Sequence, residues 1–452
     1  MFLGWQDFWL TPLWAIILIA MAMYIAKAYY PKDSYLQKWF LMALTFRMIF
    51  GIIIGLLYNY YYGYGDTLRY YFAGKVIADQ IFTDPITAWH LLWDSQQELP
   101  ADLKEAAMLV PFWRLGGSAL FIGRLSAFIN LLTFQSYYAG TLFFSAFSFS
   151  GMWVLFRAFV KRAPQYEKEL ALSFLFLPSV LCWSSGWYKE PIAMGALGWM
   201  WASFLQLSSN RKGKLFFGIV VLLFAVLLVK VKAYLFLVTL PFMAVIYIWE
   251  VTQIFPKRKK VARRLVGFTL GIFLVTGLII ILTKAYPQFA AEFLLESIVA
   301  NREELLYTNA YYRQQEGSRF DIGDFDPTWE GVLSKFPLAL FAGLFRPSIF
   351  DFGSWITIPS IIESTLLIGF TLITIYLRAR NKINIRLIPI VFTGFLFSII
   401  FSVLVGLSTS NFGTLVRYRM PALPFYTAFL LITFRQLYPT KKGNTVLSDS
   451  SS

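Results

Sequence analysis

Long apolar runs constrain this chain more than any other feature. Runs of about 17 to 25 apolar residues recur along the whole sequence, and each can cross roughly 30 Å of hydrocarbon as a helix. The runs are unbroken rather than alternating in polarity, so helices are expected and a transmembrane barrel is not. We place about eleven spans, at 12–29, 39–60, 137–157, 169–184, 191–208, 215–230, 234–252, 265–283, 356–377, 387–407 and 420–437.

The composition agrees with a membrane environment. Charged residues make up 14% of the chain and hydrophobic residues 58%, whereas an ordinary soluble protein carries about 25% charged residues. The formal net charge of +15 is typical of cytoplasmic loops that face anionic lipid, so nucleic acid is discounted as a partner. A single cysteine, Cys182, excludes an intrachain disulfide framework, and a single histidine, His90, argues against a multi-histidine metal site.

The basic residues predict the orientation. They fall on every second connection between spans, which places the N-terminus outside and the C-terminus in the cytoplasm. Residues 1–25 contain no Lys or Arg, so the first span is read as permanent rather than as a cleaved signal peptide. The basic connections contain Lys27, Lys32 and Lys38; Lys161 and Arg162; Arg211, Lys212 and Lys214; Pro256 to Arg264; Arg378 to Arg386; and Lys441 and Lys442.

The expected architecture is all-α: one polytopic transmembrane domain over residues 1–440. The same alternation puts two long segments, 61–136 and 284–355, on the external side. The first contains amphipathic stretches at 85–93 and 115–132 that are expected to lie along the membrane interface. Residues 441–452 form a short polar tail, expected to be disordered and cytoplasmic.

The motif YGDTLRYY, residues 64–71, directly follows the second span. Asp66 lies there between an aromatic span end and Arg69, close to the membrane surface. A carboxylate in this position can act as general base on a hydroxyl whose reaction partner arrives from the lipid. The alternative is a loop aspartate that pairs with Arg69 beneath an aromatic belt.

Lysines between apolar runs form a second group of candidates. Lys189 lies in FLPSVLCWSSGWYKEP, at an expected external turn where lysine is disfavoured, and either Glu190 or an anionic ligand can be its partner. Lys230 and Lys232, in LVKVKAY, also fall on the expected external side. They can bind an anionic ligand or extend to lipid headgroups.

Arginines supply a third group. Arg346 lies in LFRPSIFDFGSW with Asp351, and Arg417 and Arg419 lie in NFGTLVRYRMPALPF. Planar guanidinium groups suit bidentate recognition of phosphate, although a single arginine at this depth is also a common interfacial anchor. Together with the lysines, they predict a cationic external site for a lipid-linked phosphate.

No cofactor is expected. Asp324 and Asp326, in RFDIGDFDPTW, have a spacing that can bind a divalent cation, but such acidic patterns are common in exposed loops. The sequence contains no Walker loop, nucleotide-binding fingerprint or serine nucleophile elbow, so cytosolic ATP is not an expected energy source.

These motifs and the layout resemble the GT-C superfamily of membrane glycosyltransferases, which includes enzymes similar to the protein O-mannosyltransferases. In that superfamily a first large external loop carries a catalytic acid just after a span, and the donor is a sugar linked to polyprenyl phosphate. Asp66 matches the position of that acid. Two departures stand out: two spans precede the loop instead of one, and no second acid is adjacent to Asp66.

The resemblance implies a glycosyltransferase of the bacterial inner membrane that builds cell-surface glycans. It would transfer a sugar from a polyprenyl-phosphate donor to a glycan, lipid or protein acceptor on the external face, with Asp66 as base and Arg346, Arg417, Arg419 and Lys189 around the leaving phosphate. A polysaccharide polymerase or ligase is one alternative, and it would depend on arginines rather than on Asp66. A transporter or flippase of lipid-linked sugars is another, and broken helices with paired ionisable residues inside spans would favour it.

Overall fold

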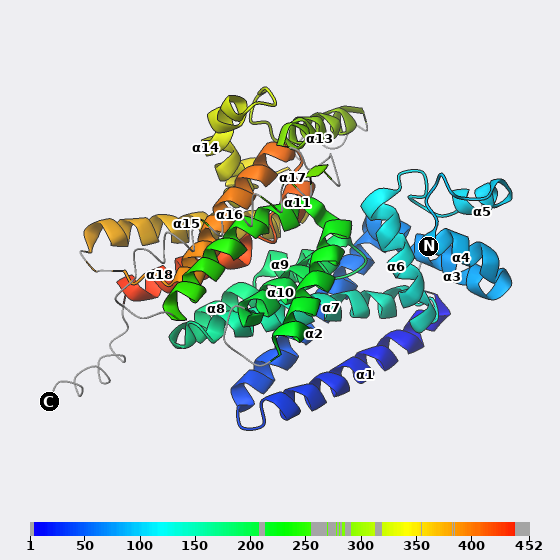
Figure 1. The fold of residues 1–452 in the computed structure, drawn as a ribbon, viewed down its shortest axis with the longest axis horizontal. Helices are drawn as coiled ribbons and strands as arrows, with labels where there is room; N and C mark the ends of the chain where they lie inside the picture. The colour runs from blue at the N-terminus through cyan, green and yellow to red at the C-terminus, as the bar shows by residue number, and fades with distance from the viewer. Residues whose placement is uncertain are drawn as a thin grey trace. The chain divides into compact units, whose positions relative to one another are not determined.

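The predicted helical architecture is confirmed in the computed structural model, which is all-α (Figure 1). The structure describes residues 4–207, 213–254, 291–311, 319–353, 355–381, 383 and 385–438, together with single residues at 269, 277, 280, 283 and 284. The chain divides into two units. The first comprises Met1–Ala158 and Val180–Leu237, and the second comprises Phe159–Ser179 and Val238–Ser452.

The helices follow one another with short connections. A π-helical turn, Leu57–Tyr62, continues directly from α2. In chain order the α-helices are α1 (Trp5–Tyr29), α2 (Ser34–Leu56), α3 (Asp66–Thr83), α4 (Pro85–Trp93), α5 (Lys104–Met108), α6 (Gly117–Leu132), α7 (Tyr137–Val160), α8 (Glu167–Leu175), α9 (Pro178–Trp183), α10 (Lys189–Leu207), α11 (Lys214–Ile254), α13 (Ala291–Tyr311), α14 (Trp329–Phe345), α15 (Ile358–Arg380), α16 (Pro389–Ser408), α17 (Phe412–Tyr418) and α18 (Leu423–Leu437).

Six helical segments among the described residues are long and apolar enough to cross a membrane. They are the features of a multi-pass integral membrane protein, and they correspond to seven of the predicted spans. The six are Trp5–Tyr29, Ser34–Tyr62, Tyr137–Val160, Lys214–Glu250, Trp355–Arg380 and Pro389–Ser408. The fourth is divided by Lys232, whose φ of −148° and ψ of 77° are not helical, at the connection predicted between the spans 215–230 and 234–252.

The four other predicted spans are not among these six segments or lie outside the described residues. The predicted span 191–208 is the 19-residue helix α10, which is not one of the six apolar segments. Residues 169–184 do not form one helix, because the chain leaves the helical conformation before Pro178 and divides into α8 and α9, of 9 and 6 residues. A residue before proline disfavours the α region, which accounts for the break. The predicted span 420–437 is the 15-residue helix α18, shorter than about 20 residues expected for a full crossing. The predicted span 265–283 and the tail 441–452 lie outside the described ranges, apart from single residues.

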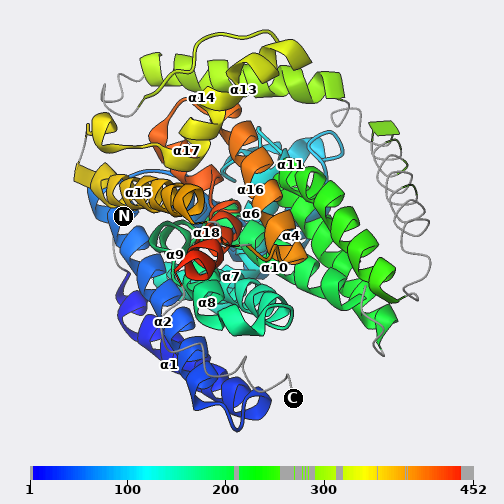
Figure 2. The same ribbon diagram turned by 90° about the vertical axis from the view of Figure 1, so that its left-hand side faces the viewer.

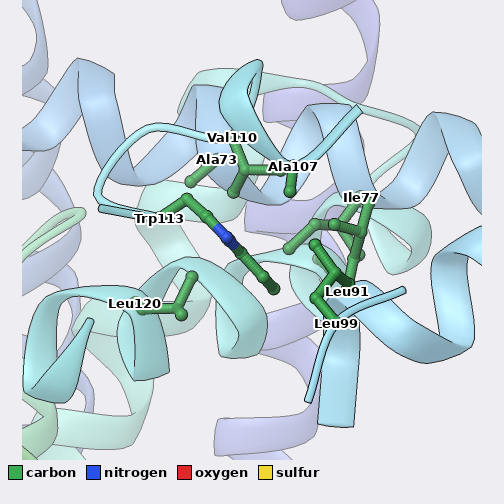
Figure 3. Packing of buried hydrophobic residues seen from close by; sticks show 9 residues of the cluster. Ala73, Ile77, Leu91, Leu99, Ala107, Val110, Trp113 and Leu120 are labelled. Carbon is green, nitrogen blue, oxygen red and sulfur yellow. The ribbon is translucent and has the colours of Figure 1, made fainter. Parts of the chain in front are cut away.

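The segment 61–136 folds into a layer of short helices within the first unit. Both predicted amphipathic stretches are helical, as α4 and α6. Helices α3 and α6 cross closely, since a Cβ on Gly74 would lie 2.4 Å from the backbone of Ser126. Trp113 fills the space between the helices (Figure 3). The buried cluster consists of Ala73, Ile77, Leu91, Leu99, Ala107, Val110, Trp113, Leu120 and Ala127.

In the second unit, α16 packs against both α14 and α18 (Figure 2). The contact with α14 is a close backbone approach, because a Cβ on Gly406 would lie 2.1 Å from the carbonyl oxygen of Ala339. Helix α14 was not predicted: it is an apolar helix of 17 residues inside the segment 284–355, which the sequence indicated to be an external loop. Small residues at a crossing of this kind let helices pack without a hydrophobic driving force.

Helices α7 and α10 in the first unit also pack closely at small residues. A Cβ on Gly151 would lie 2.1 Å from the carbonyl oxygen of Gly195, and a Cβ on Gly198 would lie 2.2 Å from that of Gly151. Real Cβ atoms do not approach a backbone oxygen so closely, so these three glycines define the separation of the two helices.

We expect Gly151→Ala to destabilise the protein and Gly218→Ala to leave it equally or more stable. Relative to glycine, alanine favours the helix by up to about 1 kcal/mol at either position. Only Gly151 is crowded, because a Cβ on Gly218 meets no atom within 4 Å. Overpacking costs about 1–3 kcal/mol. Thermal unfolding of the detergent-solubilised protein measures both variants, and equal unfolding temperatures would contradict the close crossing.

Candidate functional site

Asp66 is the first residue of α3, at a helix start that only glycine allows. The residue before it, Gly65, has a φ of +136°, a conformation that L side chains rarely adopt, and a Cβ there would lie 2.5 Å from the ring of Tyr58. A carboxylate in the first turn of a helix is stabilised by the helix dipole and by the free N–H groups. The motif thus fixes Asp66 at the end of the second span, beside Tyr58.

Tyr58 connects Asp66 to the second predicted motif. Its ring lies 5.8 Å from that of Tyr188, centroid to centroid. Tyr188 immediately precedes Lys189, the first residue of α10, whose Nζ donates to Ser118 Oγ at 2.8 Å. The segments that carry Asp66 and Lys189, more than a hundred residues apart, therefore meet in the first unit.

Arg69 does not pair with Asp66 in the structure. Its guanidinium carbon lies 4.1 Å from the centroid of the Phe112 ring, an arrangement typical of a cation–π interaction. Phe112 in turn stacks on Tyr70 at 4.7 Å. The alternative in which Asp66 pairs with Arg69 is therefore wrong, and Arg69 instead contacts the segment that contains Phe112.

Glu190 and Lys232 form a buried ion pair. The distance from Lys232 Nζ to Glu190 Oε1 is 3.0 Å, and the two side chains are 6% and 2% exposed, respectively. Lys232 occupies the break in α11, whereas Lys230 is exposed on the helix before the break. Of the two partners predicted for Lys189, the carboxylate of Glu190 is thus bound by a different lysine.

The predicted arginines lie in the second unit. The Arg346 guanidinium pairs with Asp351, with Nε at 3.1 Å from Oδ2, and lies 5.1 and 5.2 Å from the ring centroids of Phe320 and Phe412. Three quarters of its side chain is covered. Arg346 is thus held in a fixed orientation by one carboxylate and two aromatic rings.

Arg419 is fully buried and donates to main-chain carbonyls. Its guanidinium binds the carbonyl oxygens of Leu344 at 3.1 Å and Arg346 at 2.6 Å, and the Ser364 hydroxyl at 3.0 Å. These contacts satisfy the carboxyl end of α14 and join it to α15, a role for which arginine suits a helix C-terminus. Arg417 lies one half-turn earlier, on α17, and is half-buried.

The acidic segment around Asp324 is bound by an arginine. Arg302, on α13 and 2% exposed, pairs with Asp321 and, at 3.2 Å, with Asp324. Among the residues that the structure describes, no group of three or more side chains is arranged to hold a metal ion. Asp326 is exposed on the same segment.

Arg47, which is not among the predicted site residues, is fully buried within the second span. Its guanidinium donates to the hydroxyl oxygens of Ser148, at 2.9 Å, and Ser184. No carboxylate in the described part of the chain forms an ion pair with it. The signal was present in the sequence, because an ionisable residue in the middle of an apolar run marks a functional or specially partnered position.

No family model, curated protein or solved structure matches this chain.

We expect Lys232→Met to destabilise the protein by about 3–5 kcal/mol, because it leaves the Glu190 carboxylate buried without its cation. The double variant Glu190→Gln/Lys232→Met removes both charges and is expected to recover most of that loss. Unfolding in mixed micelles is measured for Lys232→Met, Glu190→Gln and the double variant. The comparison gives the coupling free energy between the two side chains. Additive effects would show that the two groups do not stabilise each other.

Acid unfolding tests the Arg346–Asp351 pair. Burial raises the pKa of the Asp351 carboxyl, but hydrogen bonds from Arg346 and Ser348 outweigh it and hold the pKa below its ordinary value of 3.8. A carboxyl with a lowered folded-state pKa stabilises the protein above its unfolded-state pKa and loses that contribution as the pH falls through the folded value. The wild type is therefore more stable than Asp351→Asn at neutral pH. The difference in unfolding free energy between the two narrows below pH 3.8.

The matched control for this measurement is Asp326→Asn, since Asp326 is exposed and forms no ion pair with a described residue. Its unfolding temperature should follow that of the wild type over the whole pH range. The difference in stability between the wild type and Asp351→Asn could instead stay constant down to the lowest pH. That result would show that the lost hydrogen bonds, and not the lost charge, account for the difference.

Proposed function

We propose that this protein is a membrane glycosyltransferase that transfers a sugar from a polyprenyl-phosphate-linked donor to a hydroxyl on an acceptor at the external face. The observation that carries the proposal is the meeting of two motifs in the first unit: Asp66 at the start of α3 and, across Tyr58 and Tyr188, Lys189 at the start of α10. An acid and a cation at the ends of apolar helices suit a reaction between a lipid-borne donor and a polar acceptor.

The reaction assigned to Asp66 is general base catalysis. Its carboxylate takes the proton of the acceptor hydroxyl, the hydroxyl oxygen attacks the anomeric carbon of the donor sugar, and the bond from that carbon to the phosphate oxygen breaks with its electron pair leaving on the phosphate. A positioned base contributes about 10²- to 10⁴-fold in rate. Asp66 is half-buried, which leaves it accessible to an acceptor.

Lys189 is proposed to stabilise the departing phosphate. Its Nζ donates to Ser118 Oγ, which fixes the position of the ammonium. A fixed cation stabilises developing negative charge most strongly where little water competes. The buried Glu190–Lys232 pair lies at the break of α11. Lys230, which is exposed just before the break, is proposed as a further ligand for the anionic donor.

We propose Arg346, Arg417 and Arg419, all in the second unit, as phosphate ligands. Arg346 fits this role best, because its guanidinium is pre-oriented by Asp351 and part of it is exposed. Arg419 fits least well, since its two terminal nitrogens already donate to carbonyl and hydroxyl oxygens. A phosphate bound at Arg346 would gain a cation that is already fixed in geometry.

A transporter or flippase of lipid-linked sugars is the second candidate, and one observation favours it. Lys232 breaks a long apolar helix and pairs, almost fully buried, with Glu190. Broken helices with paired ionisable residues inside spans are typical of transporters. The two candidates differ in whether a glycosidic bond forms.

Transfer of labelled sugar from a panel of polyprenyl-phosphate sugars, by the purified protein in liposomes, distinguishes them. We expect transfer by the wild type and by Asp102→Asn, an exposed carboxylate of the same segment, and at least a hundredfold slower transfer by Asp66→Asn, in line with the contribution of a general base. Equal transfer by all three would move the base elsewhere. Movement of the donor across the bilayer without transfer would favour the flippase.

A further inference from the structure

A small hollow in the first unit brings together polar groups that the proposed reaction does not use. It has a volume of about 30 Å³, enough for only one or two water-sized groups, and it opens to the surface. Residues of α1, the π-helical turn, α3 and α7 line it: Gly4, Gln6, Asp7, Asn59, Leu68, Tyr71, Phe72, Lys75 and Tyr137.

Two buried side chains supply fixed hydrogen-bonding groups to this hollow. Asp7 is 7% exposed, and its carboxylate accepts from Ser136 Oγ at 2.6 Å and from the backbone N–H groups of Gly4 and Tyr138 at 2.9 and 3.3 Å. Asn59 is 6% exposed, and its Nδ2 donates to the Tyr138 hydroxyl at 3.0 Å. No described residue donates to the Asn59 side-chain oxygen, which remains an acceptor.

Lys75 adds a cation at the mouth of the hollow. Its side chain is half-buried, and its ammonium makes no hydrogen bond or ion pair with a residue that the structure describes. The carboxylate of Asp7 belongs to the same hollow, yet the two do not pair. Unpaired groups of opposite charge in one lining suit a ligand that both donates and accepts hydrogen bonds.

Two uncommon backbone conformations border the hollow. Asn59 lies on the π-helical turn Leu57–Tyr62, a conformation that occurs mostly at functional sites. On the other side, the turn between α6 and α7 contains Phe134 and Gln135, with φ values of 49° and 59°. Residues other than glycine hold this left-handed conformation only when their surroundings enforce it.

The surroundings of that turn do enforce it. The Gln135 carbonyl oxygen accepts from the Tyr71 hydroxyl at 2.8 Å and from Gln6 Nε2 at 3.1 Å, and its side chain donates to Asp79. Burial raises the pKa of Tyr71, and the charges of Asp7 and Asp79 raise it further, so this phenol remains a donor at neutral pH. The hollow is therefore built before any ligand arrives.

We propose that this hollow binds a sugar of the acceptor glycan, an inference that rests on the proposed glycosyltransferase function. Hydroxyl groups donate to Asp7 and Asn59 and accept from Lys75, while the apolar face of the ring lies on the half-buried Phe72. Ligand sites commonly combine apolar walls with a few placed polar groups of this kind. A hollow of about 30 Å³ admits a hydroxyl or hydroxymethyl group but not a sugar ring, so the ring stays at the mouth.

The position of the hollow on α3 extends the inference to the length of the acceptor. Leu68, Tyr71, Phe72 and Lys75 follow the i, i+3, i+4, i+7 spacing of one helix face. At about 100° per residue, Asp66 lies roughly 200° around the helix from Leu68. The sugar in the hollow is thus not the one whose hydroxyl Asp66 deprotonates, and the acceptor contains more than one sugar.

Binding of sugars to the full-length protein in nanodiscs tests the proposal. The probes are the methyl glycosides of glucose, galactose, mannose and N-acetylglucosamine, with disaccharides of each, measured by saturation-transfer difference NMR. We expect at least one to bind and its Kd to rise at least tenfold in Lys75→Ala and Phe72→Ala, but not in Lys104→Ala, an exposed lysine outside the hollow. Disaccharides are expected to bind more tightly than monosaccharides.

Two results would overturn it: no probe binds, or those that bind do so with equal affinity in the wild type, Lys75→Ala and Phe72→Ala. The experiments can reject sugar binding in the hollow without rejecting the enzymatic function, and the reverse. Transfer in liposomes with no effect of Lys75→Ala on acceptor binding keeps the enzyme and rejects the hollow, whereas sugar binding weakened by Lys75→Ala without transfer from any donor keeps the hollow and rejects the enzyme.

Discussion

Ionised side chains in nonpolar surroundings need partners, and this constraint determines much of the structure. Removing a charge from water costs several kcal/mol unless hydrogen bonds or an opposite charge compensate. Glu190 meets Lys232 where α11 breaks, and Arg47 meets the hydroxyls of Ser148 and Ser184 within the second span. Each buried charge therefore joins separate segments of the chain, and apolar packing alone would not specify those partners.

The candidate site follows from the same constraint. With Glu190 bound to Lys232, the next residue, Lys189, is directed to Ser118 on the layer of short helices. That layer begins at Asp66, whose helix start depends on the left-handed Gly65 and on its contact with Tyr58. The acid and the cation of the proposed reaction are thus held by backbone conformation and buried pairing, which are rigid supports for a catalytic geometry.

Local patterns predicted what depends on local sequence. Hydropathy located the long apolar helices, and the lysines of LVKVKAY marked the break in α11. Hydropathy failed where proline interrupts an apolar run, at Pro178, and where an apolar helix lies inside a polar segment, as α14 does. In both cases average polarity is a poor guide to where a helix begins and ends.

Local sequence patterns could not predict the contacts between residues that are distant in the chain. Asp7 looks like an unremarkable polar residue before the first span, yet it accepts from Ser136, 129 residues away. Arg69 was paired with its neighbour Asp66 by spacing, whereas the structure places it over Phe112. Only the three-dimensional fold shows which of several possible partners a charged side chain takes.

The most direct test of the central claim is to find where the donor binds in the first unit. A polyprenyl-phosphate sugar with a photoreactive diazirine beside the phosphate would be cross-linked to the protein in liposomes, and the adducts mapped by mass spectrometry. The account predicts adducts within residues 58–71 or 183–190 that an excess of unlabelled donor suppresses. Donor-suppressible adducts that avoid both segments would contradict it.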